Sequence, residues 1–509
     1  MRRMKSRFLL IAVLTLFTVS CKDDEAPVTD TPEEKSDEGL LRSVLKSEAY
    51  DPETFMMAVM PKEQFTEILD GVPNLHPFVE AAMRVKAFPN LLLLDDLFRK
   101  ETGSNDRLSR QWQMESYVFT YLSTAIDGSE VLLSGRVTFP NRLDSGREQG
   151  KNTAQGAVHE VQTLSLSTHP AVFTPAWQPF ESLSLFTLRG FLNSAVIEPD
   201  LQGLGINRGQ QYFPIFGTAA LARQLADCVS AALEVMEQRG VRLAADGYTT
   251  NWGGSLMAST TLRFHQYYET EAPPAFREAV RLRSTFIASN IRDEVDAVLA
   301  DLQAGVNILG NFRNIFIALC ALSPQQLRGY QVSDFLSERA MTEPIAMDGK
   351  QVTLYESLTL KDAVIVAKDF VSKMEEEWSV DQIVAPDMLT PEGKLDPTSP
   401  KMVAIREILN EMNETSAYSP TLPLYLCQNK KDELFKESDF QRFCDELSQG
   451  GTNPNVHKGD IPIPEFADYL MELASFQVYH FVTYFLALME MATAETPEEV
   501  FYFLNPTAE

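Results

Sequence analysis

The stretch GYTTNWGGSLMAS, residues 247–259, decides how this chain is interpreted. Its first half contains Tyr248, Thr249 and Trp252, residue types that favour β-strands, and two glycines follow. Small and apolar residues then lead into a segment with helical character. A strand, a tight turn, a serine and a helix leave two interpretations of Ser255. It is either a nucleophile raised at a sharp turn or a serine that caps a helix, as serine often does.

The register of this turn depends on where the strand ends. With Ser255 at the turn, the strand over residues 247–252 runs directly into the two glycines, and the helix keeps its full length. A turn at Thr249 or Asn251 would cut the strand short. We therefore expect Ser255 at the strand-to-helix turn.

Strand and helix patterns alternate on both sides of this stretch. Apolar runs typical of buried strands occupy residues 156–162 and 191–199, and another ends at Asp432. Amphipathic helices are expected over residues 217–240 and 437–447. Such alternation predicts the α/β class, with a doubly wound, mostly parallel sheet.

The pattern also predicts how the chain is divided. Residues 41–116 are expected to form an N-terminal helical segment, and a hairpin signal follows. Residues 272–416 are mostly helical in pattern and interrupt the alternation, so we expect them to form an inserted helical cap. Residues 117–271 and 417–509 would then form the sheet domain, which a long apolar helix over residues 465–492 closes.

The N-terminus, MRRMKSRFLLIAVLTLFTVSC (residues 1–21), has a basic start and an apolar run too short to span a bilayer comfortably. Its end resembles the lipobox of bacterial lipoproteins, with Thr18 where leucine is usual. The resemblance implies a signal peptide and a lipid on Cys21. The acidic residues that follow resemble an export signal to the cell surface, and residues 22–40 predict a flexible tether. We expect a lipid anchor at the outer membrane or cell surface.

Composition narrows the classes of partner. The chain has 509 residues, and a hydrophobic fraction of 44% indicates a globular protein. Its net charge of −27 argues against nucleic acid as a partner, because binding phosphates requires clustered Lys and Arg. The histidines are scattered without ligand spacing, so no metal site and no cofactor are expected. Buried free thiols are expected at the remaining cysteines, with a pairing of the last two as the alternative: Cys228, Cys320, Cys427 and Cys444.

Several segments together resemble the α/β-hydrolase superfamily, and most of all its secreted lipase and esterase branch. VFTYLSTAIDGSEVLLSGRVTFP (residues 118–140) is similar to the opening hairpin of those domains. SAVIEPDLQGLG (residues 194–205) resembles their aspartate-tyrosine-x-glycine-x-glycine loop, with Leu201 in place of the tyrosine. PLYLCQNKKDELF (residues 423–435) is similar to the strand whose end holds the acid of the triad.

The resemblance implies acyl transfer by a nucleophilic serine, with a histidine base that a carboxylate orients. Carried onto this chain, it implies Ser255 as the nucleophile and Asp432 as the acid, with Glu433 as a neighbouring substitute. The histidine should follow the acid in the chain. We favour His457, with His480 as the alternative and a lost histidine as a third reading.

The resemblance also implies an oxyanion site, and here the chain departs from the family. The backbone N–H of Leu256 would be one donor, and the second would lie near His159, where the family commonly has histidine-glycine. Glu160 would bring negative charge close to the developing anion. Met257 replaces the glycine of the serine motif, so we expect the strand and the helix to open or shift there.

Two functions are consistent with these features. The first is an envelope-tethered carboxylic-ester hydrolase whose cap shapes an apolar acyl site for a small-molecule ester. The second is a catalytically decayed hydrolase fold that binds an apolar ligand under the cap. The departures at Met257, Glu160 and the histidine motivate the second.

Overall fold

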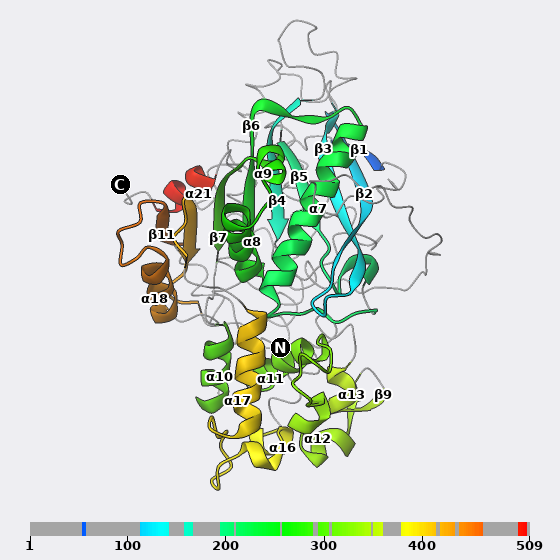
Figure 1. Ribbon diagram of the computed structural model, residues 1–509, viewed down its shortest axis with the longest axis vertical. Coiled ribbons are helices and arrows are strands. Elements are labelled where there is room, and N and C mark those ends of the chain that lie inside the picture. The colour runs from blue at the N-terminus through cyan, green and yellow to red at the C-terminus, as the bar shows by residue number, and fades with distance from the viewer. Residues whose placement is uncertain are drawn as a thin grey trace, which may run out of the picture.

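The structure is a computed structural model of the chain (Figure 1). The expected signal peptide and tether, Cys21, and the expected helix over residues 465–492 lie outside the residues that it describes. Those residues are 53–57, 112–141, 157–165, 194–207, 210–254, 257–288, 294–304, 308–347, 350–359, 378–413, 418–432, 437–461 and 497–505.

A nine-stranded sheet forms the centre of the molecule, in the order β1-β2-β3-β5-β4-β6-β7-β10-β11. The first three neighbouring pairs are antiparallel, and every pair from β5–β4 to β10–β11 is parallel. This confirms the expected mostly parallel α/β sheet. The strands are β1 (Glu53–Met57), β2 (Trp112–Thr124), β3 (Glu130–Asn141), β4 (Ala157–Ser165), β5 (Ser194–Pro199), β6 (Arg242–Gly254), β7 (Leu282–Ala288), β10 (Leu424–Gln428) and β11 (Val456–Asp460).

Helices cover both faces of this sheet. Helices α8 (Ala258–Thr270) and α18 (Glu437–Leu447) share one apolar cluster with Leu424 and Leu426 of β10. Tyr425 lies between these two leucines, and successive strand side chains point to opposite faces. Its ring contacts Phe501 of α21 (Pro497–Leu504) at 5.3 Å between centroids, so α21 covers the other face. Helix α7 (Thr218–Gln238) packs against α8 and β2 (Figure 1).

A mostly helical cap lies beyond one end of the sheet, below it in Figure 1. Its hydrophobic core is continuous with that of the sheet domain. Hydrogen bonds also join the parts: Thr218 Oγ1 to Asn413 Oδ1 at 3.2 Å, Gln326 Nε2 to the carbonyl of Ile126 at 2.9 Å, and Tyr212 Oη to the carbonyl of Thr359 at 2.7 Å. Its longer helices are α10 (Glu294–Ala304), α11 (Ile308–Cys320) and α17 (Pro400–Met412), joined by α12 (Glu338–Thr342), α13 (Leu354–Leu358), α16 (Val380–Ile383) and the hairpin of β8 (Pro344–Met347) and β9 (Lys350–Thr353).

The cap begins later in the chain than the sequence pattern indicated. Residues 272–288 form α9 (Pro274–Val280) and β7, and β7 pairs with β6 and β10 inside the sheet. The insertion therefore starts after Ala288, not at residue 272. From Ser284 onward β7 is buried on both faces, so its sequence LRSTFIA lacks the alternation of apolar and polar residues that marks a half-buried strand.

The N-terminal segment also contains a strand where a helix was expected. Residues 53–57 form β1, which pairs antiparallel with the start of β2 at Trp112–Ser116. Five residues that lie beside an otherwise unpaired strand edge gain its backbone hydrogen bonds, and this context outweighs the local helical pattern.

The side chain of Asn505 lies against the C-terminal end of β11, at the far edge of the sheet. Asn505, just after α21, accepts a hydrogen bond from the backbone N–H of Asp460 at 2.7 Å. Its side chain lies so close to Gly459 that a Cβ there would be 2.3 Å from Asn505 Nδ2. The C-terminal residue of β11 is thus paired outward, away from β10.

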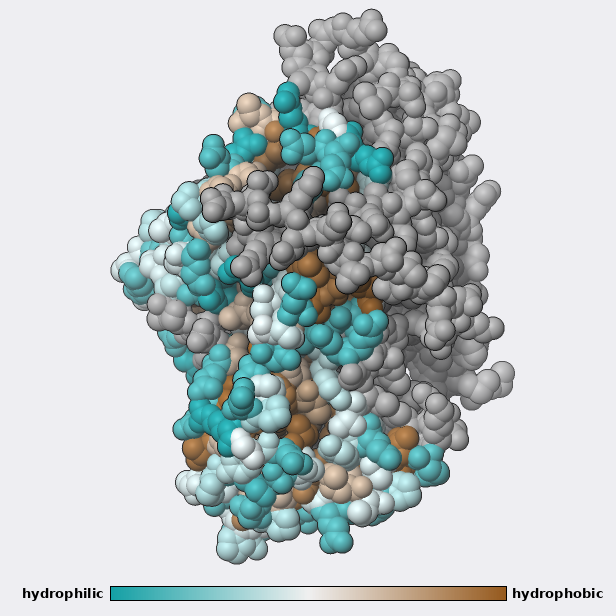
Figure 2. Space-filling model, turned by 45° about the vertical axis from the view of Figure 1, so that its right-hand side comes forward, coloured by the Kyte–Doolittle hydropathy of each residue, from teal (hydrophilic) through white to brown (hydrophobic). Residues whose placement is uncertain are grey.

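The described cysteines are all free thiols, as expected: Cys228, Cys427 and Cys444 are buried and Cys320 is partly buried. Within the described part of the chain, no helix is long and apolar enough to cross a membrane. Hydrophilic residues predominate on the described surface that Figure 2 shows. Among the described residues, the exposed large hydrophobic side chains are Val403 and Tyr502.

Candidate active site

Four parallel strands end at nearly the same level of the sheet. The ladder pairs Gly254 of β6 with Ala288 of β7, Ala288 with Cys427 of β10, and Cys427 with Gly459 of β11. The segments that follow these strands therefore leave the sheet along one carboxyl edge. In open α/β sheets, this edge is where ligands bind.

The first of these segments holds the expected nucleophile. Ser255 and Leu256 lie outside the described residues and link Gly254, the last residue of β6, to Met257, the N-cap of α8. Thr249 and Asn251, the alternative positions for the turn, lie inside β6 and pair with both β4 and β7. The strand-to-helix connection therefore follows Gly254.

Close packing between β6 and α8 depends on Gly253. A Cβ at Gly253 would lie 1.8 Å from Oγ1 and 2.7 Å from Cβ of Thr261, so no side chain fits there. Met257 has an ordinary φ of −94°, and its side chain is buried in the main core. We had expected Met257 to make the strand and the helix open or shift. The two elements instead pack closely at Gly253 and Thr261, because Gly253 supplies the close approach.

The expected acid lies in a turn just after β10. Asp432 is buried, and its backbone N–H donates to the carbonyl of Asn429 at 3.1 Å. The Asn429 side chain accepts from the backbone N–H of Lys431 at 2.6 Å and donates to the carbonyl of Ile461, the residue after β11. Asn429 thus joins the turn that carries Asp432 to the segment that follows β11.

Sequence reasoning passed over Asn429. Its signal was present, because an asparagine that opens a polar run after an apolar strand typically forms such a side-chain turn.

Between β6 and β10 lies only β7, so Gly254 and the end of β10 are about two strand spacings apart, roughly 10 Å. An imidazole between the two segments could reach a hydroxyl on one side and a carboxylate on the other.

His457 lies elsewhere on the sheet. It pairs with Tyr425 inside β11, two residues before Gly459, and three strand spacings, about 14 Å, separate β11 from β6. Its ring stacks on Tyr425 at 4.7 Å and meets the edge of Phe501 at 5.7 Å. Burial lowers the pKa of His457, which favours the neutral ring in this aromatic stack, on the face that α21 covers.

His159 and Glu160 lie within β4, where the pairing with β6 shifts register between Val158 and Glu160. The carboxyl end of β4 is Ser165, about 20 Å farther along the strand. Residues that follow Ser165, and not His159, therefore leave the sheet at the carboxyl edge. Leu256, Glu433 and His480 lie outside the described residues.

The loop after β5 is held by a buried carboxylate. Asp200 Oδ2 accepts from Ser134 Oγ at 2.6 Å, and the carbonyl of Asp200 accepts from Tyr121 at 3.0 Å. Gly205, at φ +55°, leaves room for this contact, because a Cβ there would lie 2.1 Å from Asp200 Oδ2. Leu201, which stands where the resemblance has tyrosine, is fully buried. The loop thus supports the carboxyl edge beneath the cap.

Within the described residues, no cluster of three histidine, cysteine or acidic side chains could hold a metal ion. The arrangement that the structure does describe is an edge with a strand-to-helix turn after β6 and a buried acid after β10. Such an edge can support nucleophilic acyl chemistry.

No protein-family model matches the chain, and no curated protein matches it. Solved structures do match. A mutant form of the rice cell wall degrading esterase LipA from Xanthomonas oryzae superposes with a TM-score of 0.54 at 14% sequence identity, covering 74% of this chain and 90% of that one. A ligand-bound form of the same esterase superposes with a TM-score of 0.52 at 14% identity, covering 76% and 91%.

At this identity the likeness concerns the fold, and it agrees with the strand order. Counted from β2, the sheet runs first, second, fourth, third, then fifth to eighth in chain order. The serine connection follows the fifth of these strands and the acid turn the seventh. The chain has the fold of the α/β-hydrolase superfamily.

Proposed function

We propose that the chain is a carboxylic-ester hydrolase with a serine nucleophile and an acyl-enzyme mechanism. The observation that carries the proposal is the common carboxyl edge, where the residue after Gly254 and the buried turn of Asp432 emerge two strands apart. The superposed esterase supports the choice of ester as the substrate class.

In this proposal, Ser255 attacks the ester carbonyl, and Asp432 orients the histidine that takes the proton of Ser255. The backbone N–H of Leu256, next to the N-terminus of α8, stabilises the oxyanion together with the positive end of the helix. The second donor comes from the segment that follows Ser165, because β4 ends there at the same edge.

The base is His480 or His457, since both follow Asp432 in the chain. The stacking of His457 on Tyr425, away from the carboxyl edge, favours His480. A cap packed above the edge would enclose the acyl group of a small-molecule ester, with its apolar interior facing the substrate.

A second function has one observation in its favour. His457, the histidine nearest the acid in the chain, is engaged in an aromatic stack. If His480 does not reach Ser255 either, the chain keeps a hydrolase fold without a base. It would then bind an apolar ligand beneath the cap without turnover.

We further propose that Cys21 carries a lipid that anchors the protein at the outer membrane or cell surface. The support is the basic, apolar and small-residue order before Cys21, followed by an acidic tether. An ester hydrolase held there would meet extracellular esters.

The test compares the wild-type protein with Ser255→Ala and with a matched control, Ser259→Ala. Ser259 is also buried near the start of α8 but lies within the helix. A fluorophosphonate probe and a short-chain aryl ester report on the nucleophile. We expect Ser255→Ala to lose labelling and to lower kcat by about three orders of magnitude or more, whereas Ser259→Ala retains both. A wild-type protein that neither labels nor turns over supports the binding function instead.

A further inference from the structure

Helix α8 carries three polar residues, one turn apart, on the side that faces the sheet: Thr261, His265 and Glu269. Residues four apart lie on the same face of a helix. Thr261 and His265 are fully buried, and the side chain of Glu269 is only 5% exposed. The buried side of a helix is usually apolar, so these residues, the polar row of α8, are an exception.

The first member of the polar row joins α8 to β6. The side chain of Thr261 lies against Gly253, where it leaves no room for a Cβ. The fully buried Asn251 donates from Nδ2 to the main-chain carbonyl of Thr261 at 3.0 Å. Asn251 stands four residues before Ser255, so the first turn of α8 is fastened to the strand that leads to the expected nucleophile.

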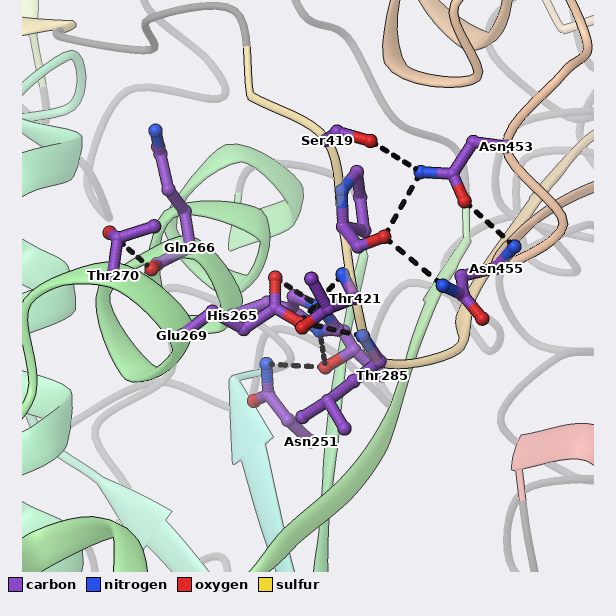
Figure 3. A network of polar contacts seen from close by, with 12 residues as sticks. Asn251, His265, Gln266, Glu269, Thr270, Thr285, Ser419, Thr421, Asn453 and Asn455 are labelled. Atoms are coloured by element: carbon purple, nitrogen blue, oxygen red, sulfur yellow. Dashed lines mark hydrogen bonds and ion pairs between the residues drawn. The ribbon is translucent and has the colours of Figure 1, made fainter. Parts of the chain in front are cut away.

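The second member joins α8 to β7 (Figure 3). Asn251 and Thr285 are paired neighbours in the ladder of β6 and β7, and Asn251 Nδ2 lies 3.4 Å from Thr285 Oγ1. Thr285 Oγ1 in turn lies 2.7 Å from His265 Nδ1. Burial lowers the pKa of His265 to about 3, so the ring is neutral near pH 7 and this contact does not require a charge.

The third member joins α8 to the segment that leads from the cap into β10. Glu269 Oε1 accepts three hydrogen bonds, from the N–H and hydroxyl of Thr421 at 2.8 and 2.6 Å and from the N–H of Leu422 at 2.6 Å. From the opposite side, Asn453 Nδ2 donates to the carbonyl of Pro420 at 3.0 Å. The segment is therefore held between α8 and the turn before β11, as Figure 3 shows.

Three successive turns of α8 are thus joined to three neighbouring parts of the sheet: β6, β7 and the entrance to β10. Apolar packing is non-directional, whereas a hydrogen bond requires its donor and acceptor at a set distance and angle. A helix that slipped by one residue would move about 1.5 Å and turn by about 100°, which would break all three contacts. The polar row therefore selects one position of α8 on the sheet.

Stability alone does not call for polar groups here. Strands covered on both faces are normally apolar, and replacing both partners of a buried hydrogen bond by apolar groups of the same shape can be nearly neutral. Apolar groups would not, however, fix the helix in one position. The part of α8 that depends most on this position is its N-terminus, which adjoins the connection with Ser255 and Leu256.

We propose that Asn251 and Thr285 are positioning residues for ester hydrolysis. By holding α8 in register, they keep the backbone N–H of Leu256 and the positive end of the helix aligned with the oxyanion. The inference rests on the proposed function, in which these groups stabilise the oxyanion. Negative charge develops on that oxygen in the transition state, so a displaced helix should lower kcat and leave KM nearly unchanged.

The variants Asn251→Leu and Thr285→Val each remove one tie to α8. Because a displacement of about 1 Å can cost about 100-fold in rate, we expect kcat on a short-chain aryl ester to fall about 10-fold to 100-fold, with KM within about twofold. Thr285→Ser retains the hydroxyl and should keep most of the activity. Thr249→Val is the matched control, because Thr249 is equally buried in β6 but its hydroxyl donates to the carbonyl of Val280 at 2.5 Å. It should leave kcat unchanged, even where it lowers the melting temperature.

Hydrogen exchange at the backbone amides of residues 258–265, the first two turns of α8, gives a readout that does not depend on turnover. We expect faster exchange there in Asn251→Leu and Thr285→Val, and wild-type rates in Thr249→Val. Wild-type exchange in both variants, or a lower melting temperature with unchanged kcat, overturns the inference. A wild-type protein that neither labels with fluorophosphonate nor hydrolyses the ester contradicts the proposed function instead. Hydrogen exchange then decides alone whether Asn251 and Thr285 fix α8.

Discussion

Gly253 and Thr261 approach so closely that a methyl group at Gly253 would overlap the Thr261 hydroxyl, with Cβ 1.8 Å from Oγ1. This contact sets how α8 leaves β6, and hence how the connection containing Ser255 is held. Gly253→Ala should lower the free energy of unfolding by about 1–3 kcal/mol, as overpacking does. Denaturant unfolding measures the loss, and fluorophosphonate labelling of Ser255 should fall with it.

Variants of Thr261 provide the control for Gly253→Ala. Thr261→Ala removes Oγ1 but keeps Cβ, which would still lie 2.7 Å from the new methyl group. We expect it to rescue Gly253→Ala only in part, and Thr261→Gly to rescue it further apart from the general cost of glycine in a helix, about 1 kcal/mol. Equal stability of Gly253→Ala in all three backgrounds would show that this contact does not restrict position 253.

The two candidate histidines should behave differently when replaced. His480→Ala should lower kcat on an aryl ester by about three orders of magnitude and leave folding intact, if His480 is the base. His457→Phe keeps an aromatic ring on Tyr425, so it should retain activity and stability. The reverse result, loss of kcat in His457→Phe with an unchanged melting temperature, would assign the base to His457.

Asp227 of α7 should make stability depend on pH. Burial raises its pKa to about 6, against the opposing hydrogen bond from Ser123 and the charge of Arg223. The native state therefore binds the proton more tightly than the unfolded chain, whose pKa is near 3.8. Stability from this group is present below pH 4 and is lost as the pH rises through 6, by an amount on the order of 3 kcal/mol.

Asp227→Asn removes that titration while the amide oxygen still accepts from Ser123. We expect this variant to be more stable than the wild type at pH 8 and to show a flatter stability profile between pH 4 and 6. Glu392→Gln, at an exposed carboxylate in the cap, changes the net charge equally and should leave the profile unchanged. Parallel profiles for the wild type and Asp227→Asn would contradict the assignment.

Cys21→Ala tests the anchor. We expect the wild-type protein in the membrane fraction of expressing bacteria, and the variant released into the soluble or secreted fraction. Metabolic labelling with a fatty-acid analogue should mark the wild type alone. Retention of Cys21→Ala in the membrane fraction would show that another feature holds the protein there.

The fold was largely predictable, because strands and helices alternate and glycines mark the ends of several elements. The predicted helix over residues 437–447 matches α18. Strand β7 was missed because a strand buried on both faces shows no period of two. Strand β1 was missed because its pairing with β2 is a contact between residues far apart in sequence.

The candidate site was predictable only in part. Asp432 could be placed after its strand because a polar run follows an apolar one. The contribution of Gly253 depends on its distance from Thr261, and that of Asn429 on the carbonyl of Ile461, neither of which a local pattern encodes. The face on which His457 lies follows from the register of β11 against β10. A slip of one residue in that register would turn its side chain to the other face of the sheet.

The contact between Asn505 and the end of β11 has a consequence for self-association. An edge strand offers unpaired backbone groups to any other extended chain, and this is how sheets extend into aggregates. At Asp460 the outward N–H is already used by Asn505, and Gly459 lies against the same side chain. A second molecule cannot add a strand at this end of β11 without first displacing Asn505. Asn505→Ala should therefore expose a new pairing site and increase concentration-dependent aggregation.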